Sequence, residues 1–150
     1  MSKYLVSGAA GFIGSRVSEM LLSAGHQVVG VDNHNTAYDV RLKDWRLARL
    51  SAIPGYTHCR QDITDFKAME TLFKEQGPID GIVNLAARAG VRASVEDPWA
   101  FVDTNVNGTL NLLEMAHRAG VPKFVQASTS SIYGANAPVP TSEEADSSHP

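Results

Sequence analysis

The segment Gly8-Ala9-Ala10-Gly11-Phe12-Ile13-Gly14 decides the fold of this chain. It separates an apolar run at residues 4–7 from a stretch, 12–24, with apolar residues every three or four positions. A glycine-rich turn between a strand and a helix directs backbone amides at one point, which suits a pyrophosphate. We expect Gly8 and Gly11 to permit the turn and a close approach of phosphates, and Gly14 to let the helix press on the sheet. The spacing differs from G-x-G-x-x-G, and glycine triplets also occur in turns for steric reasons alone.

Beyond this segment, short runs rich in Val and Ile alternate with stretches of helical period. This pattern predicts an α/β fold of the Rossmann type, a doubly wound parallel sheet with helices on both faces. Strands are predicted at Tyr4–Ser7, Gln27–Val31, Tyr56–Arg60, Gly81–Leu85 and Lys123–Ala127. Helices are predicted at Phe12–Ala24, Phe66–Glu75 and Trp99–Ala119, and a loop at Ala135–Pro150.

The region between residues 33 and 54 is less regular. Apolar residues spaced along it predict a further helix packed on the sheet. These residues are Val40, Leu42, Trp45, Leu47 and Leu50.

An acidic residue ends the second predicted strand. Asp32 follows Gly14 by eighteen residues, which is the position of a carboxylate that accepts hydrogen bonds from both ribose hydroxyls of an adenosine. Because such a carboxylate repels a 2′-phosphate, the sequence favours NAD over NADP. The alternative is that Asp32 serves only as a turn residue before Asn33.

Composition excludes several classes of function. The 150 residues are enough for one domain with a core, and the 13 basic residues against 16 acidic ones form no basic run, so nucleic acid is not an expected partner. Cys59 is the single cysteine, so we expect no internal disulfide and a cytoplasmic location. The five histidines show no metal-ligand spacing, so we expect no metal. We expect no membrane partner, because no apolar run approaches about 18 residues and the N-terminus does not resemble a signal peptide.

Four further motifs resemble those of the extended short-chain dehydrogenase/reductase family, the NAD-dependent epimerases and dehydratases. They are Asp62-Ile63, Asn84-Leu85-Ala86-Ala87, Asn105-Val106-Asn107-Gly108-Thr109 and Ser128-Thr129-Ser130-Ser131-Ile132-Tyr133-Gly134. The family usually has threonine at position 7 and histidine at position 84, where this chain has Ser7 and Asn84. The resemblance implies an NAD site made by Gly8, Gly11, Phe12, Ile13, Gly14, Asp32, Asn33, Asp62, Ile63, Leu85, Ala86, Ala87 and Asn105.

Within that family, the stretches 32–50 and 89–94 are similar to the UDP-glucuronate 4-epimerases. Related dehydratases and decarboxylases carry acidic residues where this chain has Ser130 and Ser131, which favours epimerisation. The resemblance implies that the Thr129 hydroxyl assists catalysis at C4 of the sugar, and that Thr129, Ser130 and Ser131 hold the substrate carboxylate. Arg88 and Arg92 are candidate substrate contacts.

The catalytic Y-x-x-x-K pair of the family does not occur in these residues. Tyr133 is followed four residues later by Ala137, so we interpret it as structural. We therefore expect residues 1–150 to be an incomplete NAD-binding domain that lacks the C-terminal substrate domain and has no turnover of its own. The resemblance implies a UDP-sugar substrate and a homodimer for the full-length enzyme.

Three alternatives remain open. The first two are a UDP-glucose 4-epimerase and a UDP-glucuronate decarboxylase of the same family. The third is a non-catalytic NAD-binding module.

Overall fold

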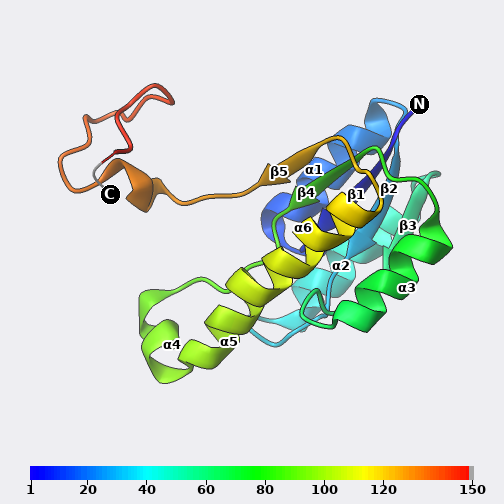
Figure 1. The fold of residues 1–150 in the computed structure, drawn as a ribbon, viewed down its shortest axis with the longest axis horizontal. Coiled ribbons are helices and arrows are strands. Elements are labelled where there is room, and N and C mark those ends of the chain that lie inside the picture. The colour runs from blue at the N-terminus through cyan, green and yellow to red at the C-terminus, as the bar shows by residue number, and fades with distance from the viewer. Residues whose placement is uncertain (149–150) are drawn as a thin grey trace.

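The computed structural model describes residues 1–148, and its centre is one sheet of five parallel strands. The strands are β1 (Lys3–Ser7), β2 (Gln27–Val31), β3 (Tyr56–Cys59), β4 (Gly81–Asn84) and β5 (Phe124–Gln126). Their spatial order is β3-β2-β1-β4-β5 (Figure 1). The order reverses beside β1, which is where doubly wound folds bind dinucleotides. The predicted fold class is confirmed.

Helices cover both faces of this sheet. They are α1 (Phe12–Ser23), α2 (Val40–Ser51), α3 (Phe66–Gln76), α4 (Val91–Glu96), α5 (Pro98–Val102) and α6 (Thr109–Arg118), with a π-helical segment η1 (Asp103–Gly108) and a 3-10 segment η2 (Ser130–Tyr133). Helices α1 and α2 pack together on one face, while α3 and α6 pack together on the other. Figure 1 shows α4 and α5 extending from the α6 end of this body.

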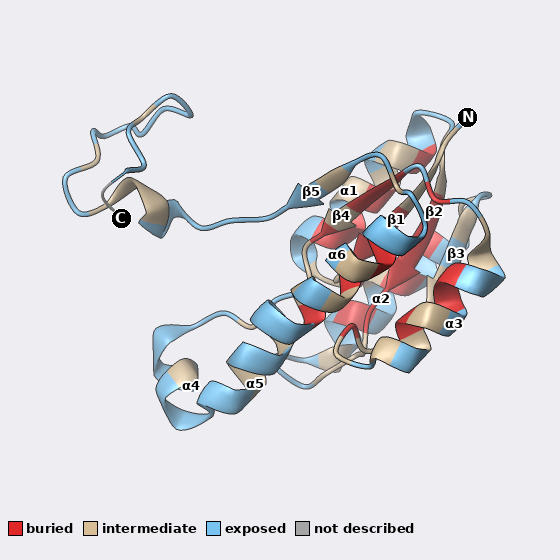
Figure 2. Ribbon diagram, in the orientation of Figure 1, coloured by how far each residue is buried: buried red, intermediate tan, exposed pale blue. Residues whose placement is uncertain are grey.

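The alternation of side chains along the strands divides the core into two layers. In β1, Leu5 joins a cluster with residues of α3 and α6, whereas Val6 joins a second cluster with Leu22 of α1 and Leu50 of α2. Both side chains are fully buried. Figure 2 shows that the buried residues concentrate in the sheet and on the inner faces of the helices.

The expected helix between residues 33 and 54 exists as α2, and the Asp39 side chain caps its N-terminus by accepting a hydrogen bond from the Arg41 amide. The prediction of its buried face was partly wrong. Leu42 and Trp45 are 48% and 58% exposed. The face that packs inward carries Lys43, Leu47 and Leu50 instead.

The helix predicted at Trp99–Ala119 is not a uniform α-helix. It runs as α5, η1 and α6, and the wider π-helical turns lie at its centre. The sequence pattern also missed α4, a short helix with no buried residue. Arg60, Leu85, Lys123 and Ala127 lie just outside the strands that were predicted to include them.

The tail contains no helix or strand between residues 135 and 148, as predicted; His149 and Pro150 lie outside the described residues. Figure 1 shows the chain leaving the body after β5. Among residues 1–148, no helix is long and apolar enough to cross a bilayer.

Candidate functional site

The glycine turn connects β1 to α1 at the carboxyl edge of the sheet. Gly8 has a φ of 66°, and a Cβ there would lie 3.0 Å from the Ala86 amide nitrogen. The Gly11 amide donates to the Gly8 carbonyl at 2.9 Å, and Gly11 is the N-cap of α1. A Cβ at Gly14 would lie 2.8 Å from the Gly8 carbonyl carbon. Backbone atoms therefore occupy the space that a Cβ would need at Gly8, Gly11 and Gly14, and only glycine fits at these positions.

Asp32 lies at the end of β2 and is 7% exposed. Its Oδ2 accepts a hydrogen bond from the Ala10 amide at 3.2 Å, and its Oδ1 accepts one from the His34 amide at 2.8 Å. Lys43 Nζ lies 3.2 Å from the same Oδ1. The carboxylate is thus fixed against the glycine turn by groups from two other segments, which is more than a turn residue needs.

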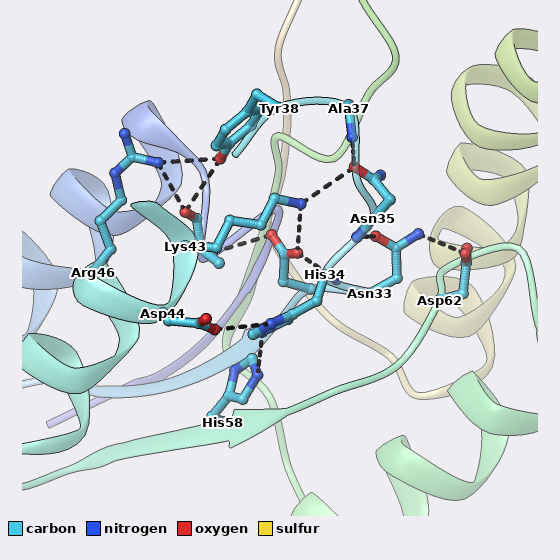
Figure 3. Close-up of polar contacts among 12 residues, drawn as sticks. Asn33, His34, Asn35, Ala37, Tyr38, Lys43, Asp44, Arg46, His58 and Asp62 are labelled. Carbon is cyan, nitrogen blue, oxygen red and sulfur yellow. Dashed lines mark hydrogen bonds and ion pairs between the residues drawn. The ribbon is translucent and has the colours of Figure 1, made fainter. Parts of the chain in front are cut away.

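Sequence reasoning missed Lys43, which is 4% exposed and forms this ion pair from α2 (Figure 3). A signal for it was present. Lys43 precedes Leu47 by four residues and Leu50 by seven, so it occupies the same helical stripe as the two buried leucines. A charged residue in a buried stripe requires a partner, and Asp32 supplies it.

The next loop towards the sheet edge places Asp62 beside Asn33. Asn33 Nδ2 donates to Asp62 Oδ2 at 2.6 Å, and Thr64 donates to Oδ1 through its amide and its hydroxyl. Burial raises the pKa of Asp62, but the hydrogen bonds from Asn33 and Thr64 outweigh it and hold the pKa below the usual value. Asp62 is therefore an ionised acceptor at neutral pH.

On the other side of the turn, a hydrogen-bond network centred on the buried Ser7 and Asn84 joins β1, β4, β5 and α6. Ser7 donates its hydroxyl proton to Asn84 Oδ1 and accepts the amides of Leu85 and Ala86 at 3.0 and 3.1 Å. Asn84 Nδ2 donates to Thr109 Oγ1 and Gln126 Oε1 at 3.1 and 2.8 Å. Both departures from the family pattern, Ser7 and Asn84, are thus accommodated in one satisfied network.

These segments enclose a cavity of about 380 Å³ at the carboxyl edge of the sheet, within the range of small-molecule sites. Many residues predicted to hold NAD or substrate line it: Gly8, Gly11, Asp32, Asn33, Asp62, Ile63, Leu85, Ala86, Ala87 and Arg88. Residues that the sequence did not single out also line it: Val31, Asn35, Ala37, Tyr38, Lys43, Gln61, Ala89, Ala93, Phe101 and Thr104.

Two buried side-chain atoms of residues that line the cavity have no partner. Among the described residues, nothing hydrogen-bonds to the buried Arg88 Nε or to the buried Gln61 Oε1. Buried polar groups in proteins are almost always paired. Both residues belong to the cavity lining, which is consistent with a polar ligand in this cavity.

Other predicted NAD residues lie outside the cavity lining. The side chains of Phe12 and Ile13 are 81% and 62% exposed, so only their backbone amides at the start of α1 could serve a pyrophosphate. Asn105 accepts the Arg88 amide at 2.7 Å and donates to the Arg88 carbonyl at 3.0 Å. It therefore fixes the loop that carries Arg88.

Of the predicted substrate residues, Arg88 lines the cavity and the other four do not. Thr129, Ser130 and Ser131 are exposed beyond β5, where Thr129 Oγ1 accepts the Ser131 amide at 3.3 Å and caps η2. Arg92 is exposed on α4. Among residues 1–148, no three His, Cys, Asp or Glu side chains gather as a metal site would require.

The strand order, the glycine turn before α1 and Asp32 at the end of β2 define a dinucleotide-binding domain of the Rossmann type. A family model described as the NAD dependent epimerase/dehydratase family matches residues 4–150, so the chain belongs to that family. This confirms the resemblance inferred from the motifs, and NAD is the cofactor of the family.

Relatives of known name agree with this assignment. The chain is 55% identical over 138 residues to a UDP-glucuronate 4-epimerase of Thermodesulfobacterium geofontis, covering 92% of the chain and 42% of that protein. The crystal structure of the Bacillus cereus UDP-glucuronic acid 4-epimerase with UDP-glucuronic acid and NAD has a TM-score of 0.79 at 36% identity, covering 91% of this chain and 43% of that one.

A UDP-glucose 4-epimerase is also similar. The Thermus thermophilus enzyme in complex with NAD has a TM-score of 0.71 at 38% identity, covering 85% of this chain and 37% of that one. The chain thus spans less than half the length of each of these three relatives.

Proposed function

We propose that this chain is the NAD-binding part of a nucleotide-sugar 4-epimerase that interconverts UDP-glucuronate and UDP-galacturonate through a 4-keto intermediate. The observation that carries the proposal is the cavity between the glycine turn and the fixed carboxylate of Asp32. The similarity to UDP-glucuronate 4-epimerases supports the choice of reaction.

The residues of the cavity fit the parts of NAD. The amides at the start of α1, including those of Phe12 and Ile13, would receive the pyrophosphate. Asp32 would accept the ribose hydroxyls, and Asp62 with Ile63 would flank the adenine. When bound, NAD accepts a hydride from the sugar and returns it to the opposite face.

The loop after β4 would line the path of the cofactor towards the sugar. Leu85, Ala86 and Ala87 line the cavity, and the small side chains of the two alanines allow a close approach. Asn105 would act indirectly, by holding the backbone of Arg88 at both its amide and its carbonyl. Arg88, with its unpaired Nε, would then offer a donor to a phosphate or carboxylate.

The hydroxyls after β5 would define the reaction. Thr129 would hydrogen-bond to the C4 oxygen of the sugar while the C4 hydroxyl loses its proton. The hydroxyls of Thr129, Ser130 and Ser131 would donate hydrogen bonds to the substrate carboxylate. A held, charged carboxylate resists decarboxylation of the keto acid. This role requires the exposed segment beyond β5 to lie closer to the cavity in the longer enzyme than it does here. Arg92, on the separate helix α4, remains a candidate substrate contact that would need its own approach to the cavity.

A decarboxylase places a glutamate at the position of Ser131. In the longer enzyme, we expect Ser131→Glu to increase the ratio of decarboxylated to epimerised product. An unchanged ratio would refute the assigned role of the hydroxyls. A UDP-glucose 4-epimerase is the second candidate, favoured by the similarity to the Thermus thermophilus enzyme; product analysis with both sugars distinguishes the two.

We also propose that the 150 residues have no turnover by themselves, because they contain no Y-x-x-x-K to act as the base. UDP-galacturonate formed from UDP-glucuronate and NAD above a blank would refute this. A non-catalytic NAD-binding module would behave in the same way, and it differs in having no longer form with the Tyr-Lys pair.

The helix that runs through α5, η1 and α6 supports the proposed homodimer of the full-length enzyme. Its apolar side chains Trp99, Val102, Val106, Leu110 and Leu113 are between 44% and 76% exposed. An apolar face of this kind is typical of an association surface.

Calorimetric titration with NAD and NADP tests the cofactor site directly. We expect NAD to bind more tightly, and Asp32→Ala to weaken NAD by about tenfold or more, since hydrogen bonds to a charged acceptor are lost. Asp44→Ala is the matched control, because Asp44 is an exposed acid on α2 near the same site. Equal effects of the two exchanges, or no binding to the parent chain, would refute the proposed site.

A further inference from the structure

Two basic residues line the cavity, and Lys43 is buried as a whole whereas Arg88 is partly exposed. The Lys43 ammonium lies 3.2 Å from Asp32 Oδ1 and 3.3 Å from Asn35 Oδ1, and 5.2 Å from the centre of the Tyr38 ring. Figure 3 shows Lys43 reaching from α2 towards the segment of Asn35 and Tyr38. A buried cation depends on its counter-charge, because water cannot replace it.

The ion pair with Lys43 changes the net charge that Asp32 presents to the adenosine ribose. In NAD sites of this fold, the carboxylate after the second strand accepts a hydrogen bond from the ribose 2′-hydroxyl, and its negative charge repels a 2′-phosphate. Here the charge of Lys43 cancels that of Asp32 at contact distance, and both side chains are about 95% buried. The position beside the adenosine ribose is therefore nearly neutral, and repulsion alone is a weak basis for selecting NAD.

We propose that Lys43 is able to bind an adenosine 2′-phosphate and that its ion pair with Asp32 prevents this binding. The ion pair therefore determines the choice between NAD and NADP. The inference rests on the proposed NAD site and extends it to specificity. Without the charge of Asp32, the buried ammonium lacks its counter-ion. An adenosine 2′-phosphate supplies one at the same place, and the Asn35 amide and Tyr38 hydroxyl lie within the same lining.

Arg46 provides an internal control on α2. It lies three residues after Lys43, but its guanidinium is engaged with the Ala10 carbonyl at 3.3 Å and the Tyr38 hydroxyl at 3.1 Å. It lines a different hollow, between α1 and α2. If any nearby positive charge served a 2′-phosphate, Arg46 and Lys43 would contribute equally; if the ion pair is decisive, only Lys43 would.

The test compares NAD and NADP affinities by calorimetry in five chains: the parent, Asp32→Asn, Asp32→Asn with Lys43→Met, Asp32→Asn with Arg46→Met, and Asp32→Gly. We expect Asp32→Asn to shift the ratio of affinities towards NADP by about tenfold or more. Adding Lys43→Met should abolish the shift, and adding Arg46→Met should preserve most of it. Asp32→Gly admits water to Lys43 and replaces Asp32→Asn if that variant does not remain folded.

The outcomes separate the two ideas. If the parent binds NAD but the shift is the same with and without Lys43, the inference is wrong and the proposed function stands. If Arg46→Met removes the shift as fully as Lys43→Met, the inference is also wrong. If neither dinucleotide binds to the parent or to any variant, the cofactor site itself is refuted.

Discussion

Gly14 offers the sharpest test of the glycine turn. An alanine methyl group at this position would lie 2.8 Å from the Gly8 carbonyl carbon and 3.1 Å from the Ala9 Cα, and closer still to the Gly8 carbonyl oxygen. Carbon atoms in contact prefer a separation of about 3.5–4.0 Å. All three obstacles are backbone atoms, so no side chain can rotate away, and α1 must move from the turn by several tenths of an ångström or more.

Two opposing contributions determine how much Gly14→Ala changes the free energy of unfolding. Overpacking a closed site costs about 1–3 kcal/mol, and contact with backbone places Gly14→Ala near the upper end. Replacing glycine by alanine within a helix returns about 1 kcal/mol. We therefore expect the free energy of unfolding to fall by about 2 kcal/mol, which lowers the melting temperature of a chain of this size by about 4–8 °C.

The assay is urea unfolding followed by circular dichroism, together with NAD titration. The matched control is Gly25→Ala, at the other end of α1, where φ is 81° and no atom lies within 4 Å of the added methyl group. That exchange costs backbone strain of about 1–2 kcal/mol but leaves the turn in place. NAD affinity should fall in Gly14→Ala and not in Gly25→Ala. Parent-like stability and affinity in Gly14→Ala would refute the account of the turn.

Three further predictions concern the strand beside Asp32. Tyr56→Phe should raise the free energy of unfolding by about 1 kcal/mol, because the buried Tyr56 hydroxyl has no partner among the described residues; a loss measured in urea would contradict this. Burial first, and then the nearby His34, lowers the pKa of His58. The unfolded chain therefore binds a proton below about pH 6.5 that the folded chain resists. Stability should fall as pH drops below that value, and His58→Gln, but not the exposed His117→Gln, should flatten the fall. Burial raises the pKa of the Cys59 thiol, so iodoacetamide at pH 7.5 should label it more slowly in the folded chain than in urea; equal rates would contradict this.

The histidine pair beside β2 illustrates what sequence patterns do not contain. His34 and His58 are 24 residues apart, and their Nε2 atoms lie 3.2 Å from each other (Figure 3). His34 belongs to the stretch 32–50 and His58 to the third predicted strand, and neither pattern relates the two. The contact depends on the parallel register of β2 with β3. The spacing of histidines in the sequence therefore gave no sign of it.

Helix α2 also shows which features the sequence pattern predicts and which depend on packing. The periodicity of apolar residues predicted that α2 exists, but it counted Leu42 and Trp45 as buried and overlooked Lys43. Amphipathic patterns give the number of inward-facing positions and not the partner that each one meets. A buried lysine is stable only because β2 ends with Asp32 opposite it.

The sequence by itself determined the fold class, the glycine turn and the residues that follow each strand. Period and glycine placement are local properties, and the carboxyl ends of parallel strands necessarily meet at one edge of the sheet. Only the tertiary structure decided which of those residues share a cavity. It paired Asp32 with Lys43, assigned Asn105 to the backbone of Arg88, and left Thr129 exposed beyond β5. Such contacts depend on how separate elements pack against one another, and no local pattern encodes that packing.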